Sequence, residues 1–133
     1  MTSRKNILSV VFILFIGIFF TNTTYARTIK WLDGNWEGRK FQTNNQESWQ
    51  MKFSCNSKQN AITVEYPELS CKGTFIVKQV KGKMVILIEK IKSGSCVNDG
   101  YIIITYATKD LITFTCLRDN KTRLASYCTL ERK

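Results

Sequence analysis

Apolar and polar residues alternate along most of the chain that follows its first 26 residues. Apolar residues take every second position between Trp49 and Cys55, and the same period returns between Ile62 and Tyr66. A period of two is typical of β-strands with one buried face. At Asn98-Asp99-Gly100 the Asp-Gly pair tolerates the positive φ that hairpin turns require. The pattern predicts about eight strands, over residues 36–41, 49–55, 62–66, 71–77, 84–88, 101–107, 111–117 and 123–130.

These strands are short and sequential, and no long helical period separates them, so the predicted fold class is all-β, a small antiparallel meander. We expect the meander to be a closed or nearly closed barrel, because closure removes exposed sheet edges. A β-sandwich is the alternative, and the pattern alone does not separate the two. Many inward positions carry large side chains, which predicts a filled interior rather than a ligand cavity.

The first 26 residues have a different character from the rest of the chain. Arg4 and Lys5 precede 14 almost entirely apolar residues, 7–20. A helix that spans a membrane needs about 20 residues, whereas 14 fit the apolar part of a secretory signal peptide. The small residue Ala26 follows a short polar stretch, so we predict a signal peptide over 1–26 that is cleaved after Ala26. An uncleaved membrane anchor is the alternative.

Cleavage after residue 26 of 133 leaves 107 residues, enough for one domain over 27–133. The removed segment carries two of the basic residues and none of the acidic ones, so the net charge falls from +10 to +8. We therefore expect a basic protein of the periplasm or the extracellular space, without a stable membrane span after cleavage.

Three fragments of the mature chain carry a resemblance to a known group of proteins. They are Gly34-Asn35-Trp36, then Tyr66-Pro67-Glu68-Leu69-Ser70-Cys71, then Gly94-Ser95-Cys96-Val97-Asn98-Asp99-Gly100. In this order they resemble small extracytoplasmic bacterial β domains, which occur alone after a signal peptide or behind a membrane helix in larger proteins such as receptor-type kinases. The opening Gly-x-Trp also looks like the first-strand motif of lipocalin-like barrels.

The resemblance implies structure rather than activity, because its motifs contain no catalytic residues. It implies that Cys71 and Cys96 form a disulfide, and that Trp36 plugs one end of the barrel core. No established function comes with it. Cysteines in an exported chain indicate a disulfide framework, which agrees with the implied bridge.

The remaining three cysteines lie outside the shared pattern. Cys116 and Cys128 fall on consecutive predicted strands and are candidates for a second bridge, although a hairpin turn at 120–121 brings Cys116 nearer to Ala125. The total of five is odd, so one thiol remains. Cys55, on an apolar strand face, is the candidate free thiol.

The sequence contains no histidine, and this restricts the chemistry that the protein can perform. Histidine is the usual general base near neutral pH and the commonest metal ligand, and a cysteine nucleophile needs an activating base. We therefore expect no enzymatic activity, no cofactor and no metal. Glu89 ends an otherwise apolar segment, and we expect it to be partly buried beside a lysine.

Lysines gather in one predicted hairpin region and form a candidate anion-binding surface. Such a patch attracts acidic polymers such as lipopolysaccharide, although lysine is also an ordinary solubilising residue on strand surfaces. Nucleic acid is the weakest of these partners, because binders of single strands interleave basic residues with exposed aromatics. The candidate residues are Lys78, Lys81, Lys83, Lys90 and Lys92.

Taken together, these features favour a non-enzymatic binding protein of the bacterial envelope or the extracellular space. The leading hypothesis is an inhibitor or immunity-type factor that acts on a protein through surface contacts. One alternative is a binder of lipopolysaccharide or another acidic polymer. The other is a lipocalin-like carrier of a small apolar ligand.

Overall fold

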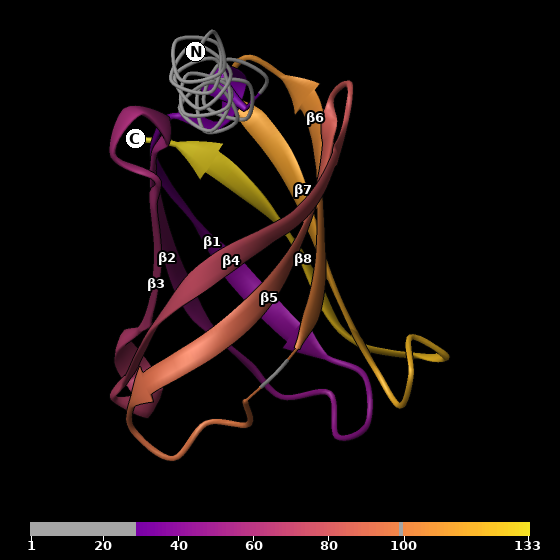
Figure 1. Ribbon diagram of the computed structural model, residues 1–133. Helices are drawn as coiled ribbons and strands as arrows, with labels where there is room; N and C mark the ends of the chain where they lie inside the picture. Colours follow the sequence, from indigo (N-terminus) through magenta and orange to yellow (C-terminus); the bar gives the residue numbers. More distant parts are fainter. Residues whose placement is uncertain (1–28, 99) are drawn as a thin grey trace, which may run out of the picture.

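The computed structural model describes residues 29–98 and 100–133, and the predicted signal peptide lies outside the described residues. Eight antiparallel strands form a closed barrel (Figure 1). Their bounds are β1 (Gly34–Gln42), β2 (Ser48–Asn56), β3 (Ala61–Tyr66), β4 (Cys71–Lys81), β5 (Met84–Ser93), β6 (Tyr101–Thr108), β7 (Leu111–Arg118) and β8 (Arg123–Arg132).

Each strand is hydrogen-bonded to the next, and β1 closes the barrel by pairing with β8. The predicted all-β barrel is thus confirmed, and the sandwich alternative is wrong. Gly38 permits the closure, because a Cβ atom at this position would lie 2.2 Å from the backbone oxygen of Thr129 on β8. Glycine is the residue that lets two backbones approach this closely.

The described residues also form three short 3₁₀ helices. η1 (Lys30–Leu32) precedes β1, η2 (Ser57–Gln59) connects β2 to β3, and η3 (Pro67–Leu69) connects β3 to β4. Pro67 begins η3, where its fixed φ and missing N–H are tolerated. In residues 29–98 and 100–133, no helix has the length and apolar character that a membrane crossing requires.

The two ends of the barrel differ. The turns at 82–83 and 109–110, η2 and both ends of the described chain lie at the upper end in Figure 1, which we call the closed end. Longer connections lie at the lower end, which we call the open end; they include 43–47 and the 94–100 loop, of which 94–98 and 100 are described.

Trp36 plugs the closed end. Its side chain is fully buried, and its indole Nε1 donates a hydrogen bond of 2.8 Å to the backbone oxygen of Leu32 in η1. The Arg132 guanidinium carbon lies 4.1 Å from the centre of the indole ring. Arg132 also donates to the backbone oxygens of Asp33 and, at 3.1 Å, Trp31. These contacts fasten η1 over the end of the barrel and exclude solvent from it.

The middle of the barrel is filled by aromatic and aliphatic side chains. The rings of Phe53 and Phe75 lie 5.5 Å apart, and those of Phe75 and Phe114 lie 6.3 Å apart. Aliphatic residues from β5, β6 and β7, such as Leu87 and Ile102, are fully buried around them. The expectation of a filled interior therefore holds for the closed end and the middle of the barrel, but not for the open end, as described below.

The bridge between Cys71 and Cys96 is present, with the two Cα atoms 6.2 Å apart. It ties the start of β4 to the 94–100 loop at the open end. The expected bridge between Cys116 and Cys128 is not formed, and both residues are buried thiols. In the β7–β8 register Cys128 faces Phe114 and Cys116 faces Ser126, so the two cysteines are diagonal rather than opposite. Cys55 is likewise a buried thiol.

Candidate functional site

The open end of the barrel contains a cavity of about 480 Å³, which we call the cup. Its floor is formed by Lys40, Tyr66 and Glu89 from β1, β3 and β5. Ser126 and Trp49 belong to its wall. Around the mouth stand residues of the connecting loops and of η3. A filled interior was expected here, and the cup corrects that expectation.

The local pattern of β1 explains how a lysine reaches the floor. Side chains two apart on a strand share a face, so Lys40 points inward as Trp36 does, and it is only 5% exposed. Its neighbour Phe41, which looks like a core residue in the sequence, points outward and is 44% exposed. Phe41 stacks there on Tyr127 of β8, with ring centres 6.0 Å apart. The sequence contains a signal for the inward position of Lys40, since Lys40 lies four residues after Trp36 and so on the same face of β1.

The three floor residues form a hydrogen-bonded chain. Lys40 Nζ donates to the Tyr66 hydroxyl over 2.9 Å, and that hydroxyl donates to Glu89 Oε2 over 2.5 Å. Lys40 Nζ also lies 4.6 Å from the centre of the Tyr66 ring and 5.1 Å from that of Phe114. Glu89 is 2% exposed. The direct partner of Glu89 is therefore a tyrosine, with the expected lysine one step beyond it.

Burial, the charge of Glu89 and the hydrogen bond to Glu89 together raise the pKa of Tyr66 well above its usual value. The phenol therefore keeps its proton over the physiological range. It accepts a hydrogen bond from the ammonium group and donates one to the carboxylate. Buried charges need such partners, since an unpaired one costs several kcal/mol.

The 94–100 loop forms part of the mouth and is held from two sides. Arg118 of β7 donates to the backbone oxygens of Asn98 and Val97, over 2.6 and 3.3 Å. The Cys71–Cys96 bridge holds the same loop covalently. Two apolar side chains at the mouth are exposed: Val97 of this loop is 68% exposed, and Leu69 of η3 is 40% exposed.

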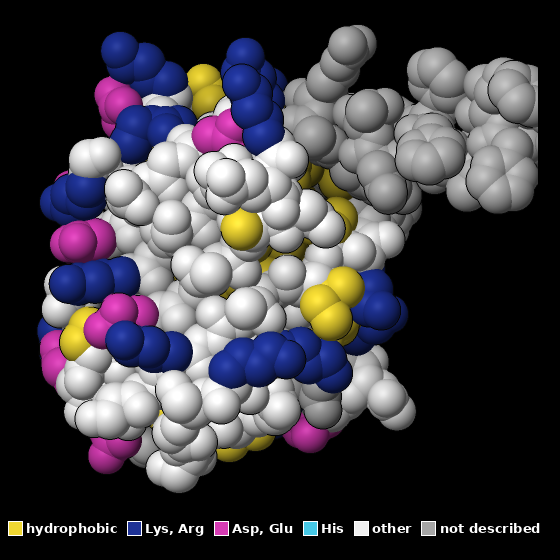
Figure 2. Space-filling model, turned by 60° about the vertical axis from the view of Figure 1, so that its left-hand side comes forward, with side chains coloured by type: hydrophobic (Ala, Val, Ile, Leu, Met, Phe, Trp, Pro, Cys, Tyr) yellow, Lys and Arg dark blue, Asp and Glu magenta, His cyan; other side chains and the backbone are white. Residues whose placement is uncertain are grey.

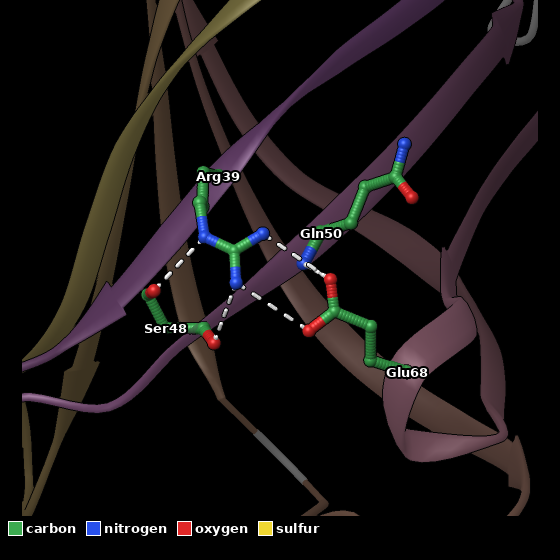
Figure 3. Close-up of polar contacts among 4 residues, drawn as sticks. All are labelled: Arg39, Ser48, Gln50 and Glu68. Atoms are coloured by element: carbon green, nitrogen blue, oxygen red, sulfur yellow. Dashed lines mark hydrogen bonds and ion pairs between the residues drawn. The ribbon is translucent and has the colours of Figure 1, made fainter.

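The position of η3 depends on a cluster of polar contacts on the outer wall, shown in Figure 3. Arg39 Nη1 and Glu68 Oε1 are 3.2 Å apart, and Arg39 Nε donates to Ser48 Oγ over 2.9 Å. Glu68 also accepts from the backbone N–H of Gln50, over 3.3 Å. An exposed ion pair adds little stability. These contacts nevertheless join η3 to β1 and β2, and so place Leu69 beside the cup.

Trp49 adds an unused donor to the wall of the cup. Its backbone lies opposite Lys40 in the β1–β2 register. The indole Nε1 is buried and has no hydrogen-bond partner among the described residues. The ammonium group of Lys40 is a second donor of the cup with unused hydrogen bonds. Such a cup suits a ligand that carries an acceptor group.

The thiols of Cys55 and Cys128 stay protonated at neutral pH. Cys128 lies close enough to Lys40 for the ammonium group to lower its pKa, but burial outweighs this effect and raises the pKa to about 12. Burial and the neighbouring Asp33 raise the pKa of Cys55, near the closed end, to about 12 as well. The thiolate is the nucleophilic form of cysteine, so both thiols are unreactive.

These two thiols predict a loss of stability at alkaline pH. In the unfolded chain a thiol with the reference pKa of 9.0 releases its proton in a range where the folded protein still retains it. The stabilisation that these two buried thiols contribute is therefore fully present below pH 9. As the pH rises from about 9 towards 12 this contribution is lost, and the free energy of unfolding falls. Urea unfolding between pH 7.5 and 10.5 measures the fall. A Cys55→Ala, Cys128→Ala protein should show a smaller fall, and equal slopes would contradict the prediction.

The five lysines of the candidate anion-binding surface are distributed along the β4–β5 hairpin. Lys78 and Lys81 lie toward the closed end, as does Lys83, whose Nζ is 4.3 Å from the centre of the Tyr106 ring. Lys90 and Lys92 lie toward the open end, about 23 and 30 Å from Lys83 at the usual strand rise. On the face shown in Figure 2, Lys and Arg side chains have Asp and Glu side chains among them.

In the part of the chain that the structure describes, no three His, Cys, Asp or Glu residues lie close enough together to hold a metal ion. What the cup offers is a set of hydrogen-bond donors around a buried positive charge. Comparison with protein-family models, with curated proteins and with solved structures finds nothing that matches this chain.

Proposed function

We propose that the protein is an exported, non-enzymatic binding protein that holds a small ligand in the open end of its barrel. The observation that carries the proposal is the cup, whose floor is a buried Lys40–Tyr66–Glu89 chain. Its volume of about 480 Å³ lies within the usual range for small-molecule sites, roughly 300–1,000 Å³. The Cys71–Cys96 bridge is compatible with an oxidising compartment.

The buried charges support binding because stability does not require them. An ion pair inside a protein can often be replaced by well-packed apolar residues with no loss of stability, or with a gain. Two such groups at the bottom of a cavity therefore favour recognition of a ligand. They also favour a ligand with a polar group at the floor over the wholly apolar ligand of a lipocalin-like carrier.

A second candidate is the inhibitor or immunity-type role, in which a partner protein covers the same end. The exposed side chains of Leu69 and Val97 at the mouth, and of Leu124 in β8, favour it. Binding to lipopolysaccharide through the hairpin lysines stays a prediction, and the spread of those lysines along β4 and β5 does not favour it.

The test uses N-phenyl-1-naphthylamine, a neutral fluorescent probe, and its anionic analogue 8-anilinonaphthalene-1-sulfonate. We expect saturable binding of one molecule of probe. Ser126→Phe places a ring in the cup and should weaken binding at least tenfold. The matched control is Thr129→Phe on the outward face of the same strand, which should bind as the parent does. If neither probe binds, or if both variants bind equally, the proposal is wrong.

A further inference from the structure

We infer that the cup selects an amphiphilic anion and holds its negatively charged group against Lys40. This inference rests on the proposed function and names the class of its ligand. The ligand enters with its charged group first, and its apolar part remains at the mouth. The argument has three parts: the unused donors of Lys40, the balance of charge in the cup, and the apolar residues at its rim.

Lys40 has hydrogen bonds left to give. An ammonium group carries three N–H donors, and Lys40 uses one, toward the Tyr66 hydroxyl. Among the described residues no carboxylate lies within ion-pair distance of Lys40. Lys40 is 5% exposed and belongs to the floor of the cup, so a ligand that fills the cup can accept from the donors that remain.

The charge of Glu89 does not cancel that of Lys40 at close range. The Tyr66 hydroxyl stands between them, bonded to Lys40 over 2.9 Å and to Glu89 over 2.5 Å. The proton of Tyr66 is thus directed at Glu89, while Lys40 keeps its remaining donors. A charge at a buried site acts more strongly than one in water, because the surroundings screen it less.

A second cation, Arg118, adds to the positive field at the mouth. Its guanidinium donates to two neutral backbone oxygens rather than to a carboxylate, so its charge stays uncompensated by the described residues. Arg123, also at the mouth, is paired with Asp119 over 2.7 Å. With Arg123 paired, the lining keeps two cations, Lys40 and Arg118, and two carboxylates, Glu89 and Glu47. Glu89 is engaged by Tyr66 and Glu47 is exposed, so the charge with unused donors at the floor is that of Lys40.

The rim suits an apolar group. Leu69 and Val97 line the cup and are exposed, and the indole of Trp49 forms part of the same wall. The polar floor and these apolar side chains, which stand among polar rim residues such as Asn44 and Ser95, match a molecule with an anionic head and an apolar tail. In a barrel with an apolar interior, the apolar tail of such a ligand would lie innermost. Here the floor is charged, so the anionic head lies innermost and the tail lies at the mouth.

The two probes differ in the feature that the inference concerns. They share the anilinonaphthalene skeleton, and only 8-anilinonaphthalene-1-sulfonate carries a negative charge. We expect the anionic probe to bind at least tenfold more tightly than the neutral one. Lys40→Met should remove that preference, so that the two probes bind with affinities within twofold of each other. The control Lys72→Met, at an exposed position on β4, should leave both affinities unchanged.

A competition assay gives the same answer without a variant, in case Lys40→Met fails to fold. Decanoate and decan-1-ol carry tails of equal length, and only decanoate is anionic. Decanoate should displace the bound anionic probe at a concentration at least tenfold lower than decan-1-ol. Equal displacement by the two would overturn the inference.

The outcomes separate the inference from the proposed function. If both probes bind with equal affinity and Ser126→Phe weakens both, the cup is a binding site without preference for anions, and only the inference is wrong. If neither probe binds, both are wrong. Binding of the anionic probe that persists in Ser126→Phe places it outside the cup and also overturns the inference.

Discussion

Replacing Glu89 with glutamine is expected to lower the free energy of unfolding by about 3 kcal/mol. The substitution keeps the shape of the side chain and an acceptor for Tyr66, but it removes the negative charge. Lys40 is then a buried cation with no anion near it. Removing one partner of a buried direct ion pair costs roughly 3–5 kcal/mol, and Lys40 and Glu89 are linked only through Tyr66. The lower value applies here because the cup opens to solvent.

Urea unfolding of Glu89→Gln, Lys40→Met and the double variant measures this coupling. The double variant should lose much less stability than the sum of the two single variants, because neither charge is left without its partner. Glu131→Gln, at an exposed position on β8, is the control and should change stability by less than about 0.5 kcal/mol. Additive losses in the double variant would show that Lys40 and Glu89 do not act as a pair.

Loss of the Cys71–Cys96 bridge is expected to cost about 3 kcal/mol, since the bridge closes a loop with a sequence separation of 25. For a domain of this size that corresponds to a fall in Tm of roughly 10–15 °C. The double substitution Cys71→Ala, Cys96→Ala measures it by thermal unfolding. Dithiothreitol should have the same effect on the parent protein, because the three other cysteines are already thiols.

The disulfide-free variant supplies its own control, since dithiothreitol should not lower its Tm further. A second readout concerns the cup. Without the bridge, the 94–100 loop is held at the mouth by Arg118, and the affinity for the anionic probe should fall. A parent protein with the same Tm in reducing and oxidising buffer would contradict the prediction.

The strands and their order were predictable because alternation of apolar and polar residues reports directly on a half-buried strand. The position at which β5 ends was not predictable from this alternation. Its apolar run ends at Ile88, yet the strand continues to Ser93, because Glu89 takes an inward position that an apolar residue would normally fill. The sequence likewise did not decide whether the barrel closes, since closure depends on the pairing of β1 with β8, which are far apart in the sequence.

The cup was harder to predict than the fold, because its floor departs from the pattern that reveals the fold. Lys40 and Glu89 are charged residues at inward positions. The sequence predicted partial burial of Glu89 beside a lysine, but it did not indicate which lysine, or that Lys40 points inward. Functional sites are the places where such departures are expected. The pairing of Cys116 with Cys128 failed for a different reason: Cys116 faces Ser126, two positions before Cys128 on β8, so the two thiols are not opposite each other.

The closure of the barrel also bears on when the chain can fold. Arg132 in β8 contacts the backbone of Trp31 and Asp33, residues 101 and 99 positions earlier in the sequence. During synthesis β1 emerges first and β8 last, so a nascent chain has no partner for the free edge of β1 until the last strand exists. Contacts between such distant residues also slow folding. The order of synthesis therefore delays closure of the barrel until β8 has been made.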